Sequence, residues 1–340
     1  MDLRDVEMDG LPVPRRYWAI LAIAIGITVS VLDGTIANVA LPTIAEDLDA
    51  SPAMSIWIVN AYQLAIVVSM LSLSSLGDIW GYKKVYVCGL LIFIVTSVAC
   101  VLSGSLVSLT VARVFQGFGA AALASVNTTL IRLIYPKRQL GRGMGINAVV
   151  VAVSAAGGPT LAAAILSVAS WQWLFAVNVP IGVAALVLAV RYLPANPVKV
   201  RERRFDWASA VMNALTFGLF IFSIEGFTHD LDWRLLLPGV LIMIVVGYFF
   251  VRRQLTRPYP LLPVDLLRVP IFSLSVCTSV CSFLAQMLAL VSLPFFLQHT
   301  LGMSEVEAGV LLTPWPLATM VSAPLAGKLI ERVHAGVLGC

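Results

Sequence analysis

The fold is decided by the stretch Tyr17-Trp-Ala-Ile-Leu-Ala-Ile-Ala-Ile-Gly-Ile-Thr-Val-Ser-Val-Leu-Asp33-Gly-Thr-Ile-Ala-Asn-Val-Ala-Leu41. As a helix it is long enough to cross a bilayer, for which about 20 apolar residues suffice. Asp33 is the only charged residue between Arg16 and Glu46. A carboxylate at such a depth costs about 2.5–3.5 kcal/mol even on translocon-insertion scales. We therefore expect Asp33 to face the interior of a helix bundle, where it serves a proton, an ion or a substrate.

The composition assigns the whole chain to the integral membrane proteins. Of its 340 residues, 59% are hydrophobic and only 12% are charged, and the mean hydropathy is +0.94. An average soluble domain carries about 25% charged residues. With the first stretch, recurring uncharged runs predict an all-α membrane fold of about ten transmembrane helices. A turn near residues 170–172 divides the longest of these runs, which are 50–77, 85–112, 114–131, 143–190, 207–224, 235–251, 269–304 and 308–327.

Positive charge is confined to alternate loops. Apart from Arg113 and Arg234, all 22 Lys and Arg residues precede the first predicted helix or follow the second, fourth, sixth, eighth or tenth. Lys and Arg accumulate in the cytoplasmic loops of membrane proteins. We therefore expect a cytoplasmic N-terminus, and the net charge of +4 reflects this topology rather than nucleic-acid binding.

Sequence signals for catalysis, metal binding and nucleotide binding are missing. No Gly-x-x-x-x-Gly-Lys-Ser/Thr phosphate loop occurs, so any work would have to draw on a gradient rather than on ATP. His229, His299 and His334 are predicted in loops without ligand spacing, and Cys277 and Cys281 lack a second ligand pair. We expect no enzyme activity, no cofactor and no metal site.

Arg113 is the second of two charges inside the predicted helices. Measured from outer helix ends near Leu41 and Leu106, Asp33 lies about 12 Å deep and Arg113 about 10 Å deep, at about 1.5 Å per residue. At matching depth the two side chains would favour each other's charged forms, and protonation of Asp33 would release Arg113. We expect a proton-coupled pair. A static ion pair between two helices and the absence of any contact are the alternatives.

Several short motifs occur in order along residues 15–335: Leu32–Pro42, Arg113–Ala121, Gly145 with Gly158 and Pro159, Trp171–Gly182, and Phe205–Trp207. Together they resemble the major facilitator superfamily, and within it the fourteen-helix drug:proton antiporters of the EmrB and QacA type. The resemblance implies a proton-coupled multidrug efflux transporter of the bacterial inner membrane. It assigns proton coupling to Asp33 and Arg113, and the antiporter motif to Gly145, Gly158 and Pro159.

The loop after the second predicted helix departs from the family pattern. Residues 74–84 read Ser-Ser-Leu-Gly-Asp-Ile-Trp-Gly-Tyr-Lys-Lys, whereas the family motif begins with glycine and has an arginine after the aspartate. Residues 327–332, Gly-Lys-Leu-Ile-Glu-Arg, echo this loop, as expected of an internal repeat. The resemblance assigns conformational gating to these two loops, through Asp78, Gly81, Lys83, Lys84, Glu331 and Arg332.

The repeat predicts two halves around an inserted helix pair. We expect a cytoplasmic N-terminus, an N-terminal six-helix half, a cytoplasmic linker, the inserted pair, a cytoplasmic loop and the start of a C-terminal half at 1–15, 16–193, 194–206, 207–251, 252–269 and 270–340, respectively. Because only two helices of the second half are predicted, we expect a truncated chain. Such a chain would transport only if another polypeptide supplied the missing wall of the cavity.

Polar side chains at membrane depth are candidates for lining a substrate cavity: Asn38, Asn60, Tyr62, Gln63, Gln116, Asn127, Asn147 and Gln286. Each can equally be a helix-to-helix hydrogen bond, worth about 0.6 kcal/mol. The expected partners are a small organic substrate, protons and the lipid bilayer. No nucleic acid is expected, and an outer-membrane or periplasmic adaptor of unknown identity is left open as a further partner. The alternatives to a drug exporter are a proton-coupled metabolite exporter or symporter, and a non-transporting truncated or accessory membrane protein.

Overall fold

The computed structural model describes residues 9–195, 205–228 and 232–303, together with positions 311, 314, 318, 322, 325 and 329. Within these residues the chain is helical and contains no strand. Eight helical segments of the described chain are long and apolar enough to cross a membrane, which confirms the all-α membrane fold. Of the other two predicted spans, one forms α11 (Pro270–Phe295). The other, 308–327, lies largely outside the described residues.

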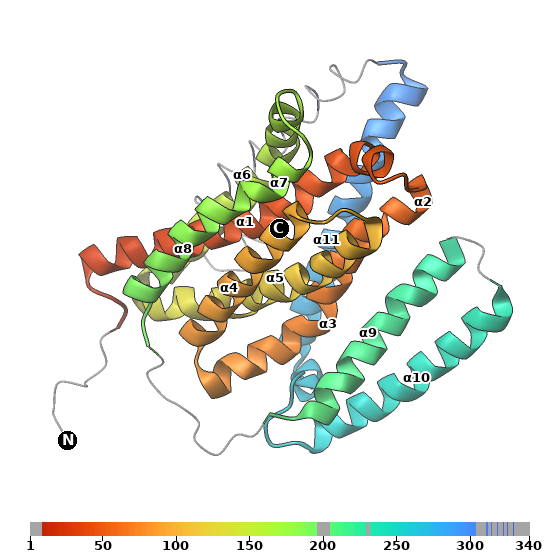
Figure 1. Cartoon of the computed structure of the whole chain (residues 1–340). Helices are drawn as coiled ribbons and strands as arrows, with labels where there is room; N and C mark the ends of the chain where they lie inside the picture. Colours follow the sequence, from red (N-terminus) through yellow and green to blue (C-terminus); the bar gives the residue numbers. More distant parts are fainter. Residues whose placement is uncertain are drawn as a thin grey trace.

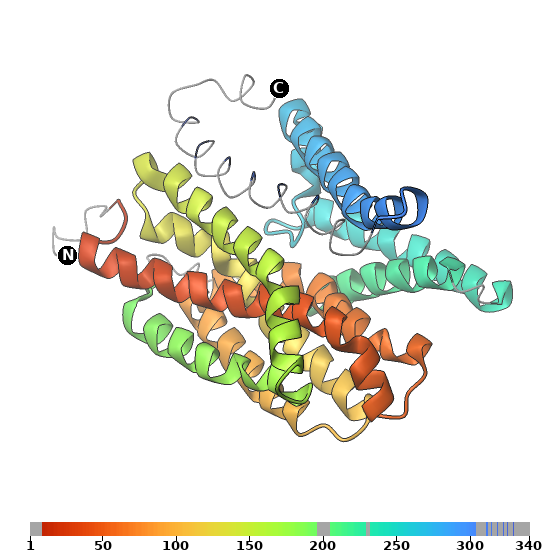
Figure 2. The ribbon, with the colours of Figure 1, turned by 90° about the horizontal axis from the view of Figure 1, so that it is seen from above.

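The first six spans pack into one bundle (Figure 1). Around α5 lie α1, α3, α4 and α6, and α8 packs against both α1 and α4. Figure 2 shows α1 running along the bundle between α6 and α8. Short helices α2 and α7 precede α3 and α8. The bounds are α1 Val13–Asp47, α2 Pro52–Ser55, α3 Trp57–Trp80, α4 Tyr82–Val101, α5 Leu106–Ile134, α6 Leu140–Leu166, α7 Gln172–Ala176 and α8 Asn178–Tyr192.

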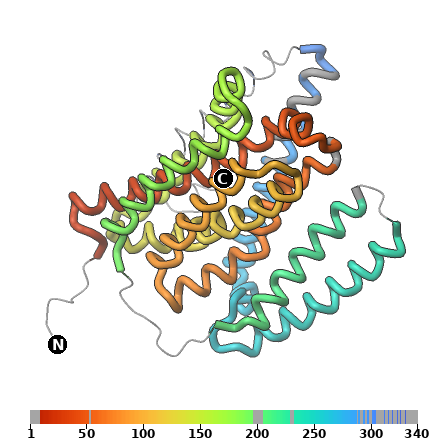
Figure 3. Tube along the Cα trace, viewed as in Figure 1, coloured from red at the N-terminus to blue at the C-terminus, as the bar shows by residue number. Residues whose placement is uncertain are grey.

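Two further spans form an antiparallel pair beside α3 (Figure 3). They are α9 (Trp207–Thr228) and α10 (Trp233–Thr256). Only 17% of the residues in the apolar segment of either helix are buried, compared with 56% for α5. The core of the molecule therefore surrounds α5, and the pair lies at its edge.

Small residues on α5 allow its neighbours to approach closely. A Cβ atom on Gly119 would lie 2.9 Å from both the carbonyl oxygen of Gly89 and the amide nitrogen of Phe93 on α4. On the side facing α3, a Cβ atom on Gly117 would lie 2.6 Å from the carbonyl oxygen of Tyr62. Neither position has room for a side chain, so backbone meets backbone at the centre of the bundle.

Several helices continue past the uncharged runs that located them in the sequence. The first helix was predicted to end near Leu41, but α1 continues through Pro42 to Asp47. The runs ending at Ile224 and Val251 likewise continue, as α9 to Thr228 and as α10 to Thr256. A charged residue ends an apolar run without interrupting backbone hydrogen bonds, so charge locates the edge of the apolar segment rather than the end of the helix.

A single residue joins α3 to α4. Gly81 ends α3 and precedes α4, and its φ of 108° lies in the left-handed region that favours glycine. This conformation lets the chain reverse between Trp80 and Tyr82 without a longer loop.

One cluster of polar side chains joins the start of α9 to the end of α10. Arg253 Nη2 contacts Asp206 Oδ1 at 2.9 Å, and Arg257 Nε lies 3.3 Å from Asp206 Oδ2. The Ser209 hydroxyl also donates to Asp206 Oδ2 over 3.0 Å. Burial raises the pKa of Asp206, but the hydrogen bonds from Arg253 and Ser209 outweigh it and hold the pKa below the ordinary value of 3.8.

We predict that acid weakens this cluster. A carboxyl group with a lowered pKa in the folded state stabilises that state above its ordinary pKa, and this contribution is lost as the pH falls through the folded-state value. Between about pH 5 and pH 3 the unfolding temperature of the unaltered chain in detergent should therefore fall further than that of Asp206→Asn. Parallel curves for the two proteins would contradict the prediction.

We also predict that Gly119→Ala destabilises the bundle, because the added methyl group must push α4 and α5 apart. Overpacking of this kind costs about 1–3 kcal/mol. Gly157→Ala is the matched control, since a Cβ atom there has no heavy atom within 4 Å. Thermal unfolding of the purified variants should show a lower midpoint for Gly119→Ala only.

Candidate functional site

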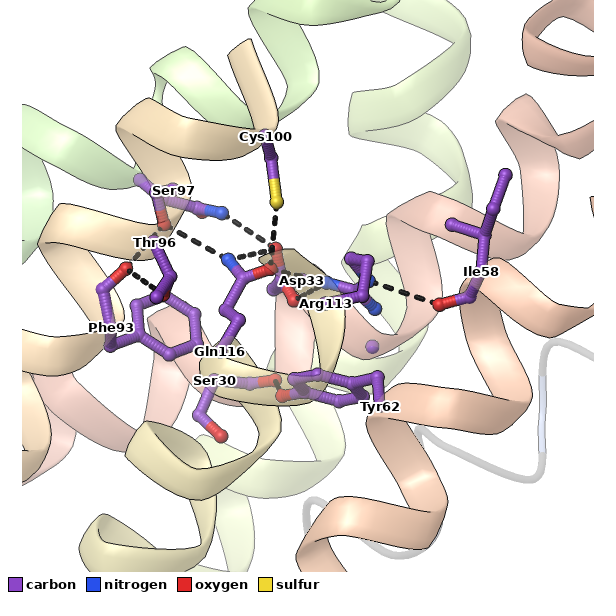
Figure 4. A network of polar contacts seen from close by, with 12 residues as sticks. Ser30, Asp33, Ile58, Tyr62, Phe93, Thr96, Ser97, Cys100, Arg113 and Gln116 are labelled. Carbon is purple, nitrogen blue, oxygen red and sulfur yellow. Dashed lines mark hydrogen bonds and ion pairs between the residues drawn. The ribbon is translucent and has the colours of Figure 1, made fainter. Parts of the chain in front are cut away.

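Asp33 and Arg113 meet in the interior of the bundle (Figure 4). Asp33 lies on α1 and Arg113 on α5, and their side chains are 1% and 0% exposed. Arg113 Nη1 donates to Asp33 Oδ2, which makes the two groups a buried ion pair. The contact predicted from their depths is confirmed, and the alternative in which they do not touch is wrong.

Asp33 accepts two more hydrogen bonds at its other carboxylate oxygen. Gln116 Nε2 donates to Asp33 Oδ1 over 3.1 Å, and Asn178 Nδ2 donates over 2.7 Å. Gln116 is itself held by α4, because its Nε2 also donates to Ser97 Oγ at 2.9 Å and its Oε1 accepts from Cys100 Sγ at 3.5 Å. The carboxylate on α1 is therefore bound directly by α5 and α8 and indirectly by α4.

Arg113 is held on its remaining sides by backbone, amide and aromatic groups. Its Nε donates to the carbonyl oxygen of Ile58 over 3.2 Å, and its Nη1 also donates to Gln116 Oε1 over 2.7 Å. The guanidinium carbon lies 4.1 Å from the ring centroid of Tyr62 and 5.5 Å from that of Phe175. The face of an aromatic ring attracts a cation, and more strongly where water is excluded. Within the described part of the chain, Nη2 has no hydrogen-bond partner.

The spacing of residues on α5 explains why one helix supplies both an arginine and an amide. Arg113 and Gln116 are three positions apart and therefore share a face. Gly117 lets α3 approach that helix, which brings the ring of Tyr62 under the guanidinium. The Tyr62 hydroxyl then donates to the carbonyl oxygen of Ser30 on α1 over 3.1 Å.

The glycines and proline that the resemblance assigned to an antiporter motif lie on α6. Gly158 is buried against Thr35, two residues after Asp33, and a Cβ atom on Gly158 would overlap Thr35 Oγ1. Gly145 is buried nearer the start of α6, and Pro159 is exposed within the helix. Of these residues, Gly158 therefore packs against the segment of α1 that carries the ion pair.

These features can be compared with known proteins. A family model described as Major Facilitator Superfamily matches residues 23–339. The chain belongs to the major facilitator superfamily. The uncharacterized transporter YebQ of Escherichia coli (strain K12) is 67% identical over 98% of this chain and 73% of YebQ. The tetracenomycin C resistance and export protein of Streptomyces glaucescens is 34% identical over 94% of this chain and 60% of that protein.

One further relative and one solved structure are also similar to this chain. The riboflavin transporter RibZ of Clostridioides difficile (strain 630) is 30% identical over 94% of this chain and 69% of RibZ. Among solved structures, that of the proton:xylose symporter XylE aligns with 95% of this chain and 70% of its own, with a TM-score of 0.60 and 12% identity. At this low identity the structural alignment supports a shared fold and no more. The chain spans only part of the length of each of these proteins.

Four of the residues that the superfamily resemblance assigned to gating, Asp78, Gly81, Lys83 and Lys84, lie near the junction of α3 and α4. Asp78 Oδ1 accepts a hydrogen bond from the Tyr82 hydroxyl over 2.7 Å. Lys83 Nζ donates to the carbonyl oxygen of Val190 near the end of α8, also over 2.7 Å. The structure thus connects Lys83 to α8. Gly81 is the residue between α3 and α4, Lys84 is exposed, and Glu331 and Arg332 lie outside the described residues.

The predicted substrate-lining residues fall into separate groups. Tyr62 and Gln116 belong to the cluster around Arg113. Asn127 Nδ2 on α5 donates to Asn147 Oδ1 on α6 over 3.0 Å, and Asn127 Oδ1 is buried without a partner among the described residues. Asn60 donates to Glu225 on α9, Asn38 is exposed and bonds to its own helix at Gly34, and Gln63 and Gln286 are exposed.

Sequence reasoning missed four members or neighbours of this polar region. Asn178, Ser97 and Cys100 are neutral, so they interrupt no apolar run and resemble ordinary packing residues. For Asn178 the available signal was an amide inside a predicted span. Glu225 was missed because its charge was taken to mark the end of a helix that continues to Thr228.

We predict that breaking the ion pair from one side destabilises the protein more than neutralising both partners. Arg113→Met leaves a buried carboxylate without its cation, which costs about 3–5 kcal/mol. The double variant Asp33→Asn/Arg113→Met should regain a large part of that loss, as measured by unfolding of the purified proteins. If the two changes were simply additive, the proposed coupling between the side chains would be absent.

Proposed function

We propose that this chain belongs to a proton-coupled transporter that exports a small organic compound in exchange for protons. The observation that carries the proposal is the buried ion pair between Asp33 and Arg113, with Gln116 and Asn178 bound to the free carboxylate oxygen. An ionisable residue inside a membrane bundle is by default a functional group, because its burial is costly.

In the proposed mechanism, Asp33 carries the proton. In the ionised state three donors from α5 and α8 hold the carboxylate, and α1 is bound to both helices. Protonation removes the charge that attracts Arg113, and a neutral carboxyl group has one acceptor fewer for these donors. The contacts among α1, α5 and α8 are then weaker, which favours a rearrangement of α1 in the protonated state.

Arg113 is suited to exchange partners in this mechanism. Its guanidinium is already held by Ile58, Gln116 and the ring of Tyr62, so it stays in place when Asp33 is neutral. Nη2, which has no partner among the described residues, offers a donor to a substrate or to another acceptor. Because both events involve this one guanidinium, protonation of Asp33 and binding of a substrate to Arg113 would be coupled.

The relatives support a small organic substrate. The names of three of them refer to riboflavin transport, to tetracenomycin C export and to multidrug resistance. We therefore propose multidrug efflux of the fourteen-helix drug:proton antiporter type. A metabolite transporter is the second candidate, favoured by the 30% identity to RibZ.

The proposed organisation follows the predicted halves. Residues 16–193 form the N-terminal half, residues 207–251 the inserted pair, and residues 270–340 begin the C-terminal half. We propose a location in the bacterial inner membrane with the N-terminus in the cytoplasm, which the distribution of Lys and Arg supports. Asp78, Gly81, Lys83 and Lys84 would gate the cytoplasmic side.

We predict that Asp33→Asn abolishes proton coupling. In everted vesicles with an imposed pH gradient, addition of riboflavin or of the planar cation ethidium should dissipate the gradient through the unaltered chain but not through the variant. Asp49→Asn is the control, because it makes the same change at an exposed position with a φ of 48°, which asparagine tolerates.

A second readout separates loss of coupling from loss of the fold. Substrate counterflow, in which labelled substrate exchanges for unlabelled substrate without a proton gradient, should persist in Asp33→Asn. Unchanged dissipation of the gradient by this variant would refute the role of Asp33 as proton carrier and favour a static ion pair.

A further inference from the structure

The helix pair carries a carboxylate on the side that contacts α3. Glu225 lies within α9, one turn before its end at Thr228, in a segment apolar enough to cross a membrane. Its side chain is half-buried. Burial of a carboxylate is costly unless it is hydrogen-bonded, so the partners of Glu225 decide what it can do.

Glu225 is held from the side of α3. Asn60 Nδ2 donates to Glu225 Oε1 over 2.8 Å, and Asn60 is also half-buried. A hydrogen bond to an ionised oxygen is roughly twice as strong as one between neutral groups. This contact therefore depends on the charge of Glu225, and it joins the helix pair to the bundle.

Asn60 lies in the same turn of α3 that supports Arg113. Ile58 accepts from Arg113 Nε, and the ring of Tyr62 lies against the guanidinium. Positions two apart on a helix face different directions, so Asn60 is directed away from the arginine. One turn of α3 thus contacts the guanidinium on one side and a carboxylate on the other.

Two helices of the described chain, α3 and α10, pack against α9. On α3 the facing group is the neutral amide of Asn60. At the adjacent end of α10 the charged residues are Asp232 and Arg234, and the Arg234 guanidinium lies 5.9 Å from the ring centroid of Trp233. In the connecting segment, His229 and Asp230 lie outside the described residues.

A second contact between α9 and α3 provides a neutral comparison. Asn213 Nδ2 donates to the carbonyl oxygen of Val68 over 2.9 Å, and the side chain of Asn213 is fully buried. Asn213 precedes Glu225 by about three turns of α9. The same pair of helices is therefore joined by one hydrogen bond that depends on protonation and by one that does not.

We propose that Glu225, with Asn60 as its donor, is a second proton-binding site of this protein, located between the helix pair and the bundle. Protonation weakens the hydrogen bond from Asn60 and loosens this end of α9 from α3. Because the same turn of α3 supports Arg113, the occupancy of Glu225 is transmitted to the ion pair. The site does not require Asp33 to carry a proton.

The test measures protonation at Glu225 itself. The full chain is reconstituted in liposomes and treated with dicyclohexylcarbodiimide, an apolar reagent that modifies protonated carboxyl groups, at a series of pH values from about 5 to 9. Peptide mass spectrometry then gives the modified fraction of Glu225 and of Asp33 separately. We expect labelling of Glu225 at low pH that disappears as the pH rises.

Matched variants separate proton binding from packing. Asn60→Leu removes the donor to the ionised form, so labelling of Glu225 should persist to higher pH. Asn213→Leu removes the neutral contact and should leave the profile unchanged. In Glu225→Gln we expect no labelling at position 225, while the labelling of Asp33 can still be measured.

Several outcomes would overturn the proposal. They are labelling of Glu225 that does not depend on pH, no labelling at any pH, and equal shifts in Asn60→Leu and Asn213→Leu. A flat profile at Asp33 together with a titrating Glu225 would count against Asp33 as proton carrier and leave this inference standing.

Discussion

A guanidinium and a carboxylate can share a low-dielectric interior only if nearly all of their polar atoms are satisfied, and the rest of the bundle is arranged around this constraint. Desolvation of each charge costs several kcal/mol, and mutual attraction alone seldom repays it. Here the carboxylate has three donors, and the guanidinium has an amide oxygen, a backbone carbonyl and an aromatic face in addition to Asp33. The ion pair therefore joins four helices, α1, α3, α5 and α8, and its loss would weaken the packing of all four.

The polar cluster in turn depends on residues without side chains. Gly117 and Gly119 bring α3 and α4 against α5 on two sides, and Gly158 brings α6 against α1. Hydrogen bonds of about 3 Å between side chains on different helices need this proximity. Close packing is thus what allows the charges to be buried, because the glycines shorten the distances between the charged groups and their partners.

The sequence predicts the charged part of the site better than its neutral part. Asp33 and Arg113 each interrupt an apolar run, so their depths could be compared, and the structure joins them. Asn178 leaves no such signal, because it is neutral and its partner on α1 depends on tertiary packing. Glu225 shows the opposite failure: its charge was visible but was interpreted as a helix boundary, since charge and helix end often coincide. The antiporter-motif and gating assignments remain predictions.

The single residue between α3 and α4 has a mechanical consequence. Helices joined by Gly81 alone cannot separate at that end, so their relative motion must be a change of angle about this point. Ile58 lies about 35 Å from Gly81 along α3, at about 1.5 Å per residue. A rotation of about 5° would displace the far end by about 3 Å, which is as long as a hydrogen bond. Gly81 is thus the point about which α3 can change its angle to α4. The other end of α3 lies at the level of Arg113 and Glu225, where a small change of angle gives the largest displacement.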